Sequence, residues 1–480
     1  MAIDHYGSAT EMLAALRARE ISAAELAELH IARIETLDGE LNAIPVKTFD
    51  RVREQAKAAD ARGAAGEDAP LLGLPMTLKE STQTAGLPQS AGIEAFAEYA
   101  PASDGLIARA VFDAGAGLLG KTNIPVALSD WQADSPVYGR TVNPWDPART
   151  PGGSTGGGAA ALAAGLTPLE VGSDIGGSIR VPAAYCGVYG HRPSETAVPR
   201  SGSFPLADLP NPAFLMGVQG PLARTATDLE LLFDVLRGPE LGEEVGWRQA
   251  LPEPRHGELG AFRVAVIDSV IGVHASRAVQ ARLEELASLL GRAGARVQAA
   301  LPDFDMQAYF LDYVRLLQVM VSQAMPREQR EARAAQMRED GDPATLAMAD
   351  ALLMDAHEYL ALVRRREVAR MAWRDFFRDW DVVIAPMTLD VAFPHQTAVY
   401  HERTLTVDNE TVPYFYNILF PMLAIFTGLP STAFPAGLDA QGLPVGLQVI
   451  GPYLEDRTTL RFAQLVEREW YRFEAPPRYA

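Results

Sequence analysis

The chain carries Gly152-Gly153-Ser154-Thr155-Gly156-Gly157-Gly158 and, after one alanine-rich stretch, Asp174-Ile175-Gly176-Gly177-Ser178-Ile179-Arg180. The stretch between them, Ala159 to Gly165, is a predicted helix of small residues. Glycines can turn successive backbone N–H groups into one concave surface that binds a negatively charged oxygen. A serine at the end of such a turn can attack a carbonyl whose oxygen lies on that surface. The two glycine-serine segments therefore indicate acyl transfer.

Apolar runs alternate with helical segments on both sides of these two segments. Leu71 to Leu78 and Gly117 to Gly120 are predicted strands, and Leu106 to Ala114 is a predicted helix. Further strands are predicted at Arg263 to Ile267 and at Asp381 to Pro386. This alternation favours an α/β sheet, and no linker, repeat or low-complexity stretch divides the chain.

Charge and composition exclude several classes of function. Lys and Arg number 42 against 61 Asp and Glu, which gives a formal net charge of −19. Such a chain repels nucleic-acid phosphates and anionic membranes, so we expect neither as a partner. Without a basic-apolar leader or a run of about 18 apolar residues, we expect a cytoplasmic protein. The single cysteine, Cys186, excludes an intrachain disulfide and a thiolate zinc cluster, and we expect no metal and no cofactor.

A phosphate-loop pattern competes for the function. Gly115 to Thr122 fits G-x-x-x-x-G-K-[ST], and Val264 to Asp268 is similar to the strand that accompanies it in nucleotide hydrolases. A phosphate loop needs a strand before it and a helix after it, so that the N–H groups of the helix start face the phosphates. Here the predicted helix precedes, and Pro125 follows closely. The order of elements opposes a P-loop nucleotide hydrolase.

The first segment also fits a second hydrolase pattern. Gly152 to Gly156 matches the G-x-S-x-G turn of α/β-hydrolases, whose serine works with a histidine and an acid. Pro147 and Pro151 oppose the strand that this turn requires. His357 and His395 lie late enough in the chain to complete such a triad, but no spacing singles out either of them.

A resemblance to a known family covers nearly the whole chain. The sequence resembles the amidase signature enzymes, most weakly across residues 239 to 375. Lys79 stands 75 residues before Ser154, and Ser154 stands 24 before Ser178, spacings similar to those in the family. Besides the two glycine-serine segments, the motifs that carry the resemblance are Gly73-Leu74-Pro75-Met76-Thr77-Leu78-Lys79, Leu119-Gly120-Lys121-Thr122-Asn123, Asn143-Pro144-Trp145-Asp146, Cys186-Gly187-Val188-Tyr189-Gly190, Gly220-Pro221-Leu222-Ala223-Arg224, Gly428-Leu429-Pro430 and Gly442-Leu443-Pro444-Val445-Gly446-Leu447-Gln448.

The resemblance implies a Ser-Ser-Lys catalytic triad. Ser178 would be the nucleophile, Ser154 a bridging serine after a cis peptide bond, and Lys79 the general base. A lysine can act as a base only when it is uncharged, so its pKa must fall by roughly three units from about 10.4. Lys79 ends an apolar run, so burial can lower its pKa. The competing interpretations are a buried ion pair with Glu80 and a surface lysine at the end of a strand.

The same resemblance assigns supporting residues. The oxyanion hole would consist of the backbone N–H groups of Ile175, Gly176 and Gly177. Three further residues would hold the two glycine-serine segments, and they are Thr155, Asp174 and Arg180. This sequence departs from the common family pattern at Thr155 and Gly158, where serine is usual.

The resemblance also implies the fold. We expect a single large α/β domain, with a central mixed, twisted sheet covered by helices on both faces. The domain would span 1–480, with N-terminal helices at about 1–60 and a catalytic core at about 61–235. A helical substrate-pocket region is expected at about 300–380, and a return to the core sheet at about 381–480.

The expected substrate is a small amide with an apolar or aryl group, with esters or carbamates as side substrates. This expectation follows from the Met-rich and aromatic helical segment 304 to 360. Candidate pocket residues are Trp131, Tyr138, Met306, Phe310 and Tyr313. A glutaminase-type amidotransferase subunit that works in a complex is the alternative, although Ile175 stands where that class has threonine. A homodimer is left open.

Overall fold

A mixed sheet of eleven strands runs through the part of the chain that the computed structural model describes, residues 4–206, 215–339 and 341–480. The strands at each end of the sheet pair mainly in parallel, whereas those in the middle are antiparallel. In spatial order they are β1 (Val46–Lys47), β3 (Gly117–Thr122), β2 (Pro75–Lys79), β6 (Leu169–Asp174), β8 (Val218–Ala223), β7 (Tyr189–Arg192), β16 (Ser431–Leu438), β17 (Pro444–Ile450), β13 (Val382–Pro386), β9 (Arg263–Val266) and β12 (Arg296–Ala299). The predicted mixed α/β sheet is confirmed.

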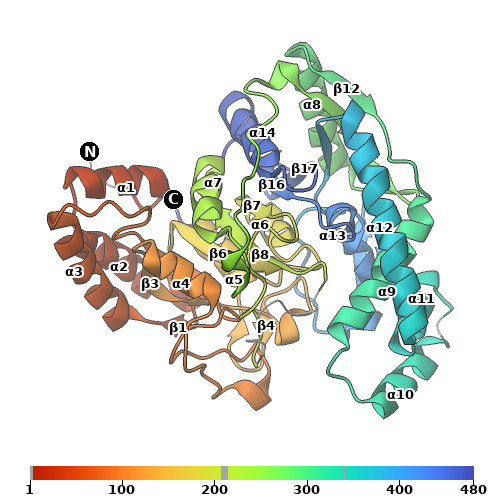
Figure 1. Ribbon diagram of the computed structural model, residues 1–480, viewed down its shortest axis with the longest axis horizontal. Coiled ribbons are helices and arrows are strands. Elements are labelled where there is room, and N and C mark those ends of the chain that lie inside the picture. Colours follow the sequence, from red (N-terminus) through yellow and green to blue (C-terminus); the bar gives the residue numbers. More distant parts are fainter. Residues whose placement is uncertain (1–3, 207–214, 340) are drawn as a thin grey trace.

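Helices cover both faces of this sheet (Figure 1). Gln448 of β17 accepts a hydrogen bond from Arg180 at the start of α6 (2.8 Å). Val449, the next residue of β17, pairs with Thr432 of β16. The Thr432 side chain contacts Thr459 of α14 (3.1 Å). Because neighbouring residues of a strand point to opposite faces, α6 and α14 lie on opposite faces.

The helices and the short paired strands complete the element order. The α-helices are α1 (Ala9–Ala18), α2 (Ala23–Leu41), α3 (Phe49–Ala64), α4 (Leu106–Asp113), α5 (Gly156–Ala163), α6 (Arg180–Cys186), α7 (Ala226–Leu236), α8 (Arg277–Arg292), α9 (Met306–Val321), α10 (Arg327–Met337), α11 (Pro343–Leu352), α12 (Ala356–Asp379), α13 (Met422–Ile425) and α14 (Asp456–Glu469). The 3₁₀ turns are Glu94–Phe96, Val126–Leu128, Glu243–Val245, Leu259–Ala261, Tyr400–Glu402 and Tyr414–Ile418. Three further strand pairs are β4 (Asp134–Ser135) with β5 (Gly139–Arg140), β10 (Ser269–Val270) with β11 (Val273–His274), and β14 (Thr404–Val407) with β15 (Glu410–Pro413).

The chemistry-bearing segments meet at one edge of the parallel part of the sheet. Strands β2, β3 and β6 run in parallel, so their carboxyl ends lie at the same edge. Lys79 is the last residue of β2 and Asp174 is the last residue of β6. Helix α5, every residue of which is buried, starts beside this edge immediately after Ser154 and Thr155. The topology therefore brings together Lys79 and the two glycine-serine segments.

The first two helices begin at capped serines, whereas one predicted strand begins later than expected. Ser8 and Ser22 each form the complete capping box at the starts of α1 and α2. The predicted strand at Leu71 to Leu78 was wrong in its first half, because the chain turns at Gly73 with φ of +82° and β2 begins only at Pro75. Apolar character alone does not separate a buried turn from a strand.

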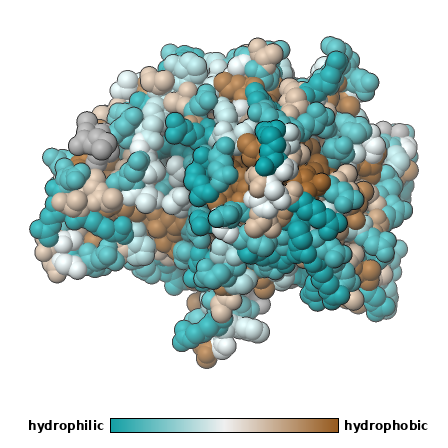
Figure 2. Space-filling model, turned by 90° about the horizontal axis from the view of Figure 1, so that it is seen from above, coloured by the Kyte–Doolittle hydropathy of each residue, from teal (hydrophilic) through white to brown (hydrophobic). Residues whose placement is uncertain are grey.

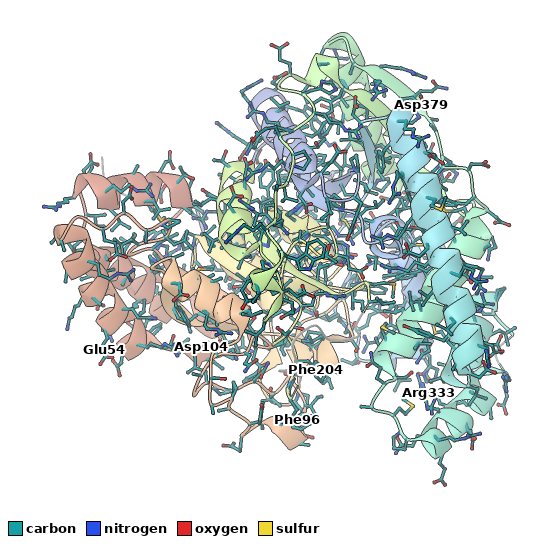
Figure 3. All side chains as sticks on the ribbon, in the orientation of Figure 1. Glu54, Phe96, Asp104, Phe204, Arg333 and Asp379 are labelled. Atoms are coloured by element: carbon teal, nitrogen blue, oxygen red, sulfur yellow. The ribbon has the colours of Figure 1, made fainter. Side chains whose placement is uncertain are left out.

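The segment expected to be helical, 304 to 360, falls mainly within α9 to α12, which lie on one side of the molecule (Figures 1 and 3). Asp379 marks the C-terminal end of α12 in Figure 3, and Arg333 belongs to α10. This side is tied to the core by the buried pair of Arg366 with Glu195 and by the Tyr309 hydroxyl, which donates to the Leu423 carbonyl (2.9 Å).

The face of the molecule shown in Figure 2 is mainly hydrophilic. On the face shown in Figure 2, hydrophobic residues form small patches among hydrophilic side chains, most clearly to the right of the middle. In the described ranges, no helix combines the length and the apolar character that crossing a bilayer requires.

Candidate active site

Lys79 lies at the centre of a cluster of hydroxyl groups. Its side chain is completely buried, and Nζ lies 2.7 Å from Ser154 Oγ, 3.0 Å from Thr155 Oγ1 and 3.0 Å from Ser173 Oγ. Lys79 forms no ion pair within the described residues. A hydroxyl group can donate as well as accept, so these partners suit an uncharged amine as well as an ammonium.

Burial lowers the pKa of Lys79 to about 7, because the charged form loses its hydration; Glu170, Asp174 and Glu80 oppose this shift by their negative charge. The competing ion pair with Glu80 is not formed. Glu80 Oε1 instead accepts from the Ser90 N–H (2.6 Å) and from the Tyr138 hydroxyl (2.7 Å). A large share of Lys79 is therefore neutral near pH 7.

Ser154 follows a cis peptide bond from Gly153, as the sequence resemblance implied. A Cβ on Gly153 would collide with the carbonyl oxygen of Asp130, so no other residue fits here. Ser154 is almost fully buried, with 1% of its surface exposed against 6% for Ser178. Exposure thus falls from Ser178 through Ser154 to Lys79.

The Asp174 carboxylate fixes the loop that carries Ser178. It accepts hydrogen bonds from the Gly177 N–H (2.9 Å), the Ile179 N–H (3.3 Å) and Arg180 Nε (3.0 Å). Burial acts to raise the pKa of Asp174, but Arg180 and Arg192 outweigh it and hold the pKa at about 2. Asp174 is therefore ionised at every working pH and keeps the loop in one conformation.

The second glycine-serine segment also contacts the first. The Ser178 carbonyl accepts from the Thr155 N–H (3.1 Å), so the two segments lie against each other. In the described residues the Ser178 hydroxyl has no hydrogen bond to the Ser154 hydroxyl. The backbone therefore holds the two glycine-serine segments against each other.

The loop amides divide into engaged and available donors. Gly177 donates its N–H to Asp174, whereas the N–H groups of Ile175 and Gly176 have no acceptor among the described residues. Trp131 Nε1 donates to the Gly176 carbonyl (2.9 Å), and the Tyr313 hydroxyl donates to the Ile175 carbonyl (3.3 Å). Two aromatic side chains thus hold the carbonyls, which orients the amides of the same loop.

The five predicted pocket residues lie in different places. Trp131 and Tyr313 support the loop before Ser178, as described above. Tyr138 donates to Glu80 instead, and the ring of Phe310 packs against the rings of Phe415 and Tyr416. Met306 is the first residue of α9 and is half-buried. The structure brings only Trp131 and Tyr313 into hydrogen-bond contact with the candidate active site.

Two residues at the site were missed in the sequence. Ser173 contacts the Lys79 amine, and Glu170 is a completely buried acid in β6. The signal for Glu170 was present, since a charge between Leu169 and Val171 in a buried strand calls for a partner. Ser173 offered no such signal, because serine is common at the ends of strands and in exposed loops alike.

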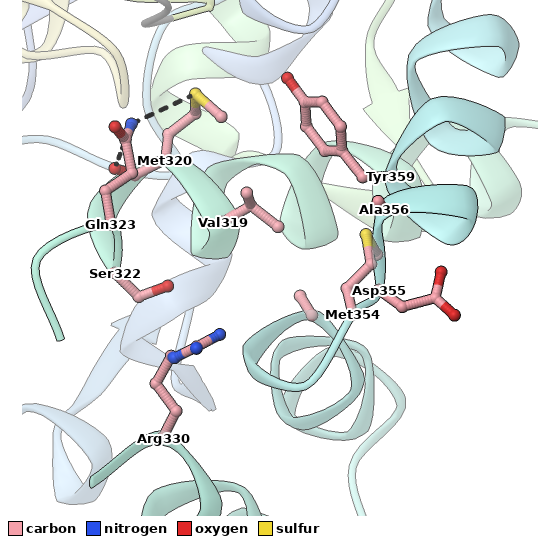
Figure 4. A pocket seen from close by; sticks show the side chains of 10 residues that line it. Val319, Met320, Ser322, Gln323, Arg330, Met354, Asp355, Ala356 and Tyr359 are labelled. Atoms are coloured by element: carbon pink, nitrogen blue, oxygen red, sulfur yellow. Dashed lines mark hydrogen bonds between the residues drawn. The ribbon is translucent and has the colours of Figure 1, made fainter. Parts of the chain in front are cut away.

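A cavity of about 370 Å³ lies farther along α9, between α9 and the helices α10 to α12 (Figure 4). Val319, Met354 and Tyr359 supply apolar walls, and Arg330 points into the space from α10 (Figure 4). The cavity contains none of the triad candidates. Tyr313 and Met320 are seven residues apart on α9, so the cavity begins roughly 10 Å along the helix from the Ser178 loop.

The residues of the phosphate-loop pattern, and the histidine near the second glycine-serine segment, have other structural roles. Gly117–Thr122 is the strand β3 and follows α4, so the phosphate-loop match has the reversed order expected from the sequence. Lys121 donates to the carbonyl of Pro88. His191, near the second glycine-serine segment in sequence, contacts Thr432 (2.9 Å) and Asp456 (3.3 Å) in the core.

Comparisons with known proteins show which family the chain matches. The amidase family model matches residues 25–460. The chain is 33% identical over 470 residues to the putative amidase AmiB2 of Mycobacterium tuberculosis, covering 94% of each chain. It is 32% identical over 489 residues to a glutamyl-tRNA(Gln) amidotransferase subunit of an Anaeromyxobacter strain, covering 97% of this chain and 96% of the relative. The solved structure of a bacterial aryl acylamidase of the amidase signature family superposes with a TM-score of 0.82, at 26% identity and 97% coverage of both chains.

Proposed function

This chain belongs to the amidase signature family and is an amide hydrolase, and from that premise we propose that it acts through an acyl-enzyme on Ser178, with Ser154 and Lys79 completing the triad. One observation carries the proposal: a completely buried amine lies among hydroxyl groups and has no ion pair in the described residues. A neutral lysine in this position is a base that can remove a hydroxyl proton.

The proton moves from the more exposed group to the more buried ones, from Ser178 through Ser154 to Lys79. Ser154 gives its proton to the Lys79 amine, and Ser178 gives its proton to Ser154 while Ser178 Oγ attacks the amide carbon. The carbonyl π electrons move to the oxygen, which becomes the oxyanion. When the C–N bond breaks, the proton on Lys79 returns through Ser154 to the leaving nitrogen. Water then attacks the ester by the same path, and the acid leaves Ser178 Oγ.

The oxyanion is stabilised by backbone donors of the Ser178 loop. The free amides of Ile175 and Gly176 are the main donors that we propose, because Gly177 already donates to Asp174. Loss of one such donor typically costs about two to three orders of magnitude in rate. Tyr313 acts indirectly, since it holds the Ile175 carbonyl, which shares a peptide plane with the Gly176 N–H, and Trp131 holds the next carbonyl of the loop.

The proposed substrates are amides with an apolar or aryl group, with esters and carbamates as side substrates. One feature supports this class: the aromatic side chains of Trp131 and Tyr313 lie beside the Ser178 loop. The similar solved structure is that of a bacterial aryl acylamidase. We expect short polar amides to be poorer substrates, because they leave this apolar surface in contact with water.

The alternative is a glutaminase-type subunit of an amidotransferase. Its support is the 32% identity to such a subunit over nearly the whole chain. Hydrolysis of anilides and alkyl amides by the purified chain alone favours the amidase. Hydrolysis of glutamine that requires added partner subunits favours the alternative.

The test combines labelling with a substrate panel. An organophosphonate that reacts with activated serines should modify one residue, Ser178, as read by peptide mass spectrometry. Ser178→Ala should lose both the label and the activity, whereas Ser203→Ala, a matched change in a half-buried bend away from the site, should keep both. Labelling at another serine, or full activity of Ser178→Ala on the panel of amides, would sink the proposal.

A further inference from the structure

Glu170 is a buried acid that the proposed mechanism does not use. It lies in β6 with none of its surface exposed, and its partner across the parallel pairing is Thr77 of β2. Lys79 is two residues after Thr77 and therefore points to the same face of the sheet. Thr122 donates its hydroxyl hydrogen to Glu170 Oε1 (2.6 Å), whereas Oε2 has no partner in the described part of the chain.

Two glycines make room for Glu170 beside Lys79 and Thr155. A Cβ on Gly158 of α5 would lie 2.5 Å from Glu170 Cγ, and a Cβ on Gly172 of β6 would lie 2.6 Å from Thr155 Oγ1. Glu170, Thr155 and Lys79 therefore share the space between the sheet and α5. This gives a physical reason for Gly158 at a position where the family usually has serine.

The nearby Asp174 is already neutralised. Its carboxylate is paired with Arg180 (3.0 Å) and lies 3.5 Å from Arg192, and all three side chains are fully buried. Two guanidinium groups more than balance one carboxylate. Asp174 can therefore contribute only part of its charge to the surroundings of Lys79.

Glu80 is also held away from Lys79. It accepts from the N–H and hydroxyl groups of Ser90 (2.6 and 2.8 Å) and from the Tyr138 hydroxyl (2.7 Å). Across β8, the residue opposite Glu170 is Leu222, which carries no charge. Neither acid has an ion pair in the described residues, but both oxygens of Glu80 accept hydrogen bonds, whereas Glu170 Oε2 has no partner there.

We propose that Glu170 is a positioning residue that acts through Lys79: its carboxyl group is the buried counter-charge that keeps the amine basic enough to take the proton from Ser154. The inference rests on the proposed function. A buried amine without a counter-charge becomes a weak base, and a weak base transfers protons less effectively in the transition state. Glu170 supplies this charge without contacting substrate.

The electrostatics agree with the geometry. Burial lowers the pKa of Lys79, and Glu170 is the largest influence that opposes this shift. Burial in turn raises the pKa of Glu170 to about 7, against the effects of Thr122, Thr77 and Lys79. Both groups change charge near neutral pH, so they titrate as a coupled pair.

Glu170→Gln tests the proposal through the pH profile of kcat/KM. Glutamine keeps the shape and the acceptor for Thr122 but has no charge. Without the carboxylate the pKa of Lys79 falls, so the acid limb of the profile should move to lower pH by on the order of one unit. The plateau should fall several-fold, because the base is weaker.

Two variants separate this role from a structural one. Glu170→Asp retains a carboxylate and should keep the acid limb within about 0.3 pH units of wild type. Glu467→Gln is the matched control, because Glu467 is another acid whose pKa is raised to about 7 by burial, in α14, where it accepts from the Ala226 N–H. Its replacement should leave the profile unchanged.

If Glu170→Gln does not fold, the double variant Glu170→Gly with Gly158→Ser provides the same neutral site with the space refilled. An acid limb unchanged in a folded Glu170→Gln or in the double variant overturns the proposal, as does an equal shift in Glu467→Gln. This failure is distinct from failure of the proposed function, which would appear as activity retained after Ser178→Ala.

Discussion

Two buried lysines at the ends of neighbouring strands show how the partners of an amine decide what it can do. Lys79 ends β2, and Lys121 lies one residue before the end of β3. Lys79 pairs with Thr122 across the sheet, so Lys121 points to the opposite face. Neither side chain is exposed, and burial lowers the pKa of Lys79 to about 7 and that of Lys121 to about 8. Burial alone therefore does not distinguish them.

The hydrogen-bond partners of the two amines distinguish Lys79 from Lys121. Lys121 donates to the carbonyl of Pro88, and a carbonyl can only accept. Lys79 faces Ser154, Thr155 and Ser173, whose hydroxyls can give protons as well as take them. Only the second arrangement offers a path for a proton to leave a serine. The comparison teaches that a catalytic lysine is recognised by what surrounds its amine.

Replacing each lysine by methionine gives the largest expected contrast. Lys79→Met should lower kcat/KM by about 10²- to 10⁴-fold, because the general base is lost. The variant should also melt at a higher temperature, since methionine removes the cost of burying an amine. Steady-state kinetics and thermal unfolding measure both. Activity of Lys79→Met within threefold of wild type would remove the basis of the comparison.

The pH dependence of the wild type should span about two orders of magnitude. The proposed base, Lys79, must be neutral, and burial lowers its pKa to about 7, so kcat/KM should rise tenfold per pH unit below that value and level off above about pH 8. At pH 5 it should be about 100-fold below the plateau. A full profile with an anilide substrate is the measurement. An acid limb near pH 10 would mean that Lys79 is not desolvated in solution.

Removing one hydroxyl should sharpen the comparison further. Thr155→Val keeps the shape but takes away a partner of the Lys79 amine at 3.0 Å, so kcat/KM should fall about tenfold. Thr155→Ser keeps the hydroxyl and should remain within about threefold of wild type. Equal losses in the two variants would point to packing of the threonine methyl group as the cause.

Lys121→Met should have the smallest effect. No proton path involves its amine, so kcat/KM per folded molecule should change by less than about threefold. Nucleotide should not raise the melting temperature of the wild type, since the phosphate-loop match forms a strand. A loss of activity as large as that of Lys79→Met would show that the two lysines share one role.

Much of the candidate site could be predicted from the sequence because its motifs are local. The spacing of Lys79, Ser154 and Ser178 and the resemblance of their motifs led to three residues that the fold brings to one edge of the sheet. Asp174 and Arg180 pair as expected, because they bracket a single loop. The engagement of the Gly177 N–H by Asp174 could not be predicted, since it depends on the exact course of that loop.

The pocket residues were the least predictable part. Trp131 and Tyr313 reach the Ser178 loop with their polar ends, whereas Tyr138 contacts Glu80 and Phe310 lies among other rings. In the sequence, aromatic residues that line a pocket look the same as those that fill a core. Only their direction differs, and direction is set by packing between distant helices.

The sequence by itself determined the α/β class, the approximate positions of the strands β2, β3, β9 and β13, and the family to which the chain belongs. These features depend on neighbours within a few residues or on motifs of fixed spacing. Tertiary structure alone decided that Lys79 has hydroxyl partners, that Glu170 shares its space, and that Lys121 faces the other way. The reason is physical: the charge of a buried group is set by the dielectric and the donors around it, and chain folding brings these together from strands about 45 to 95 residues apart.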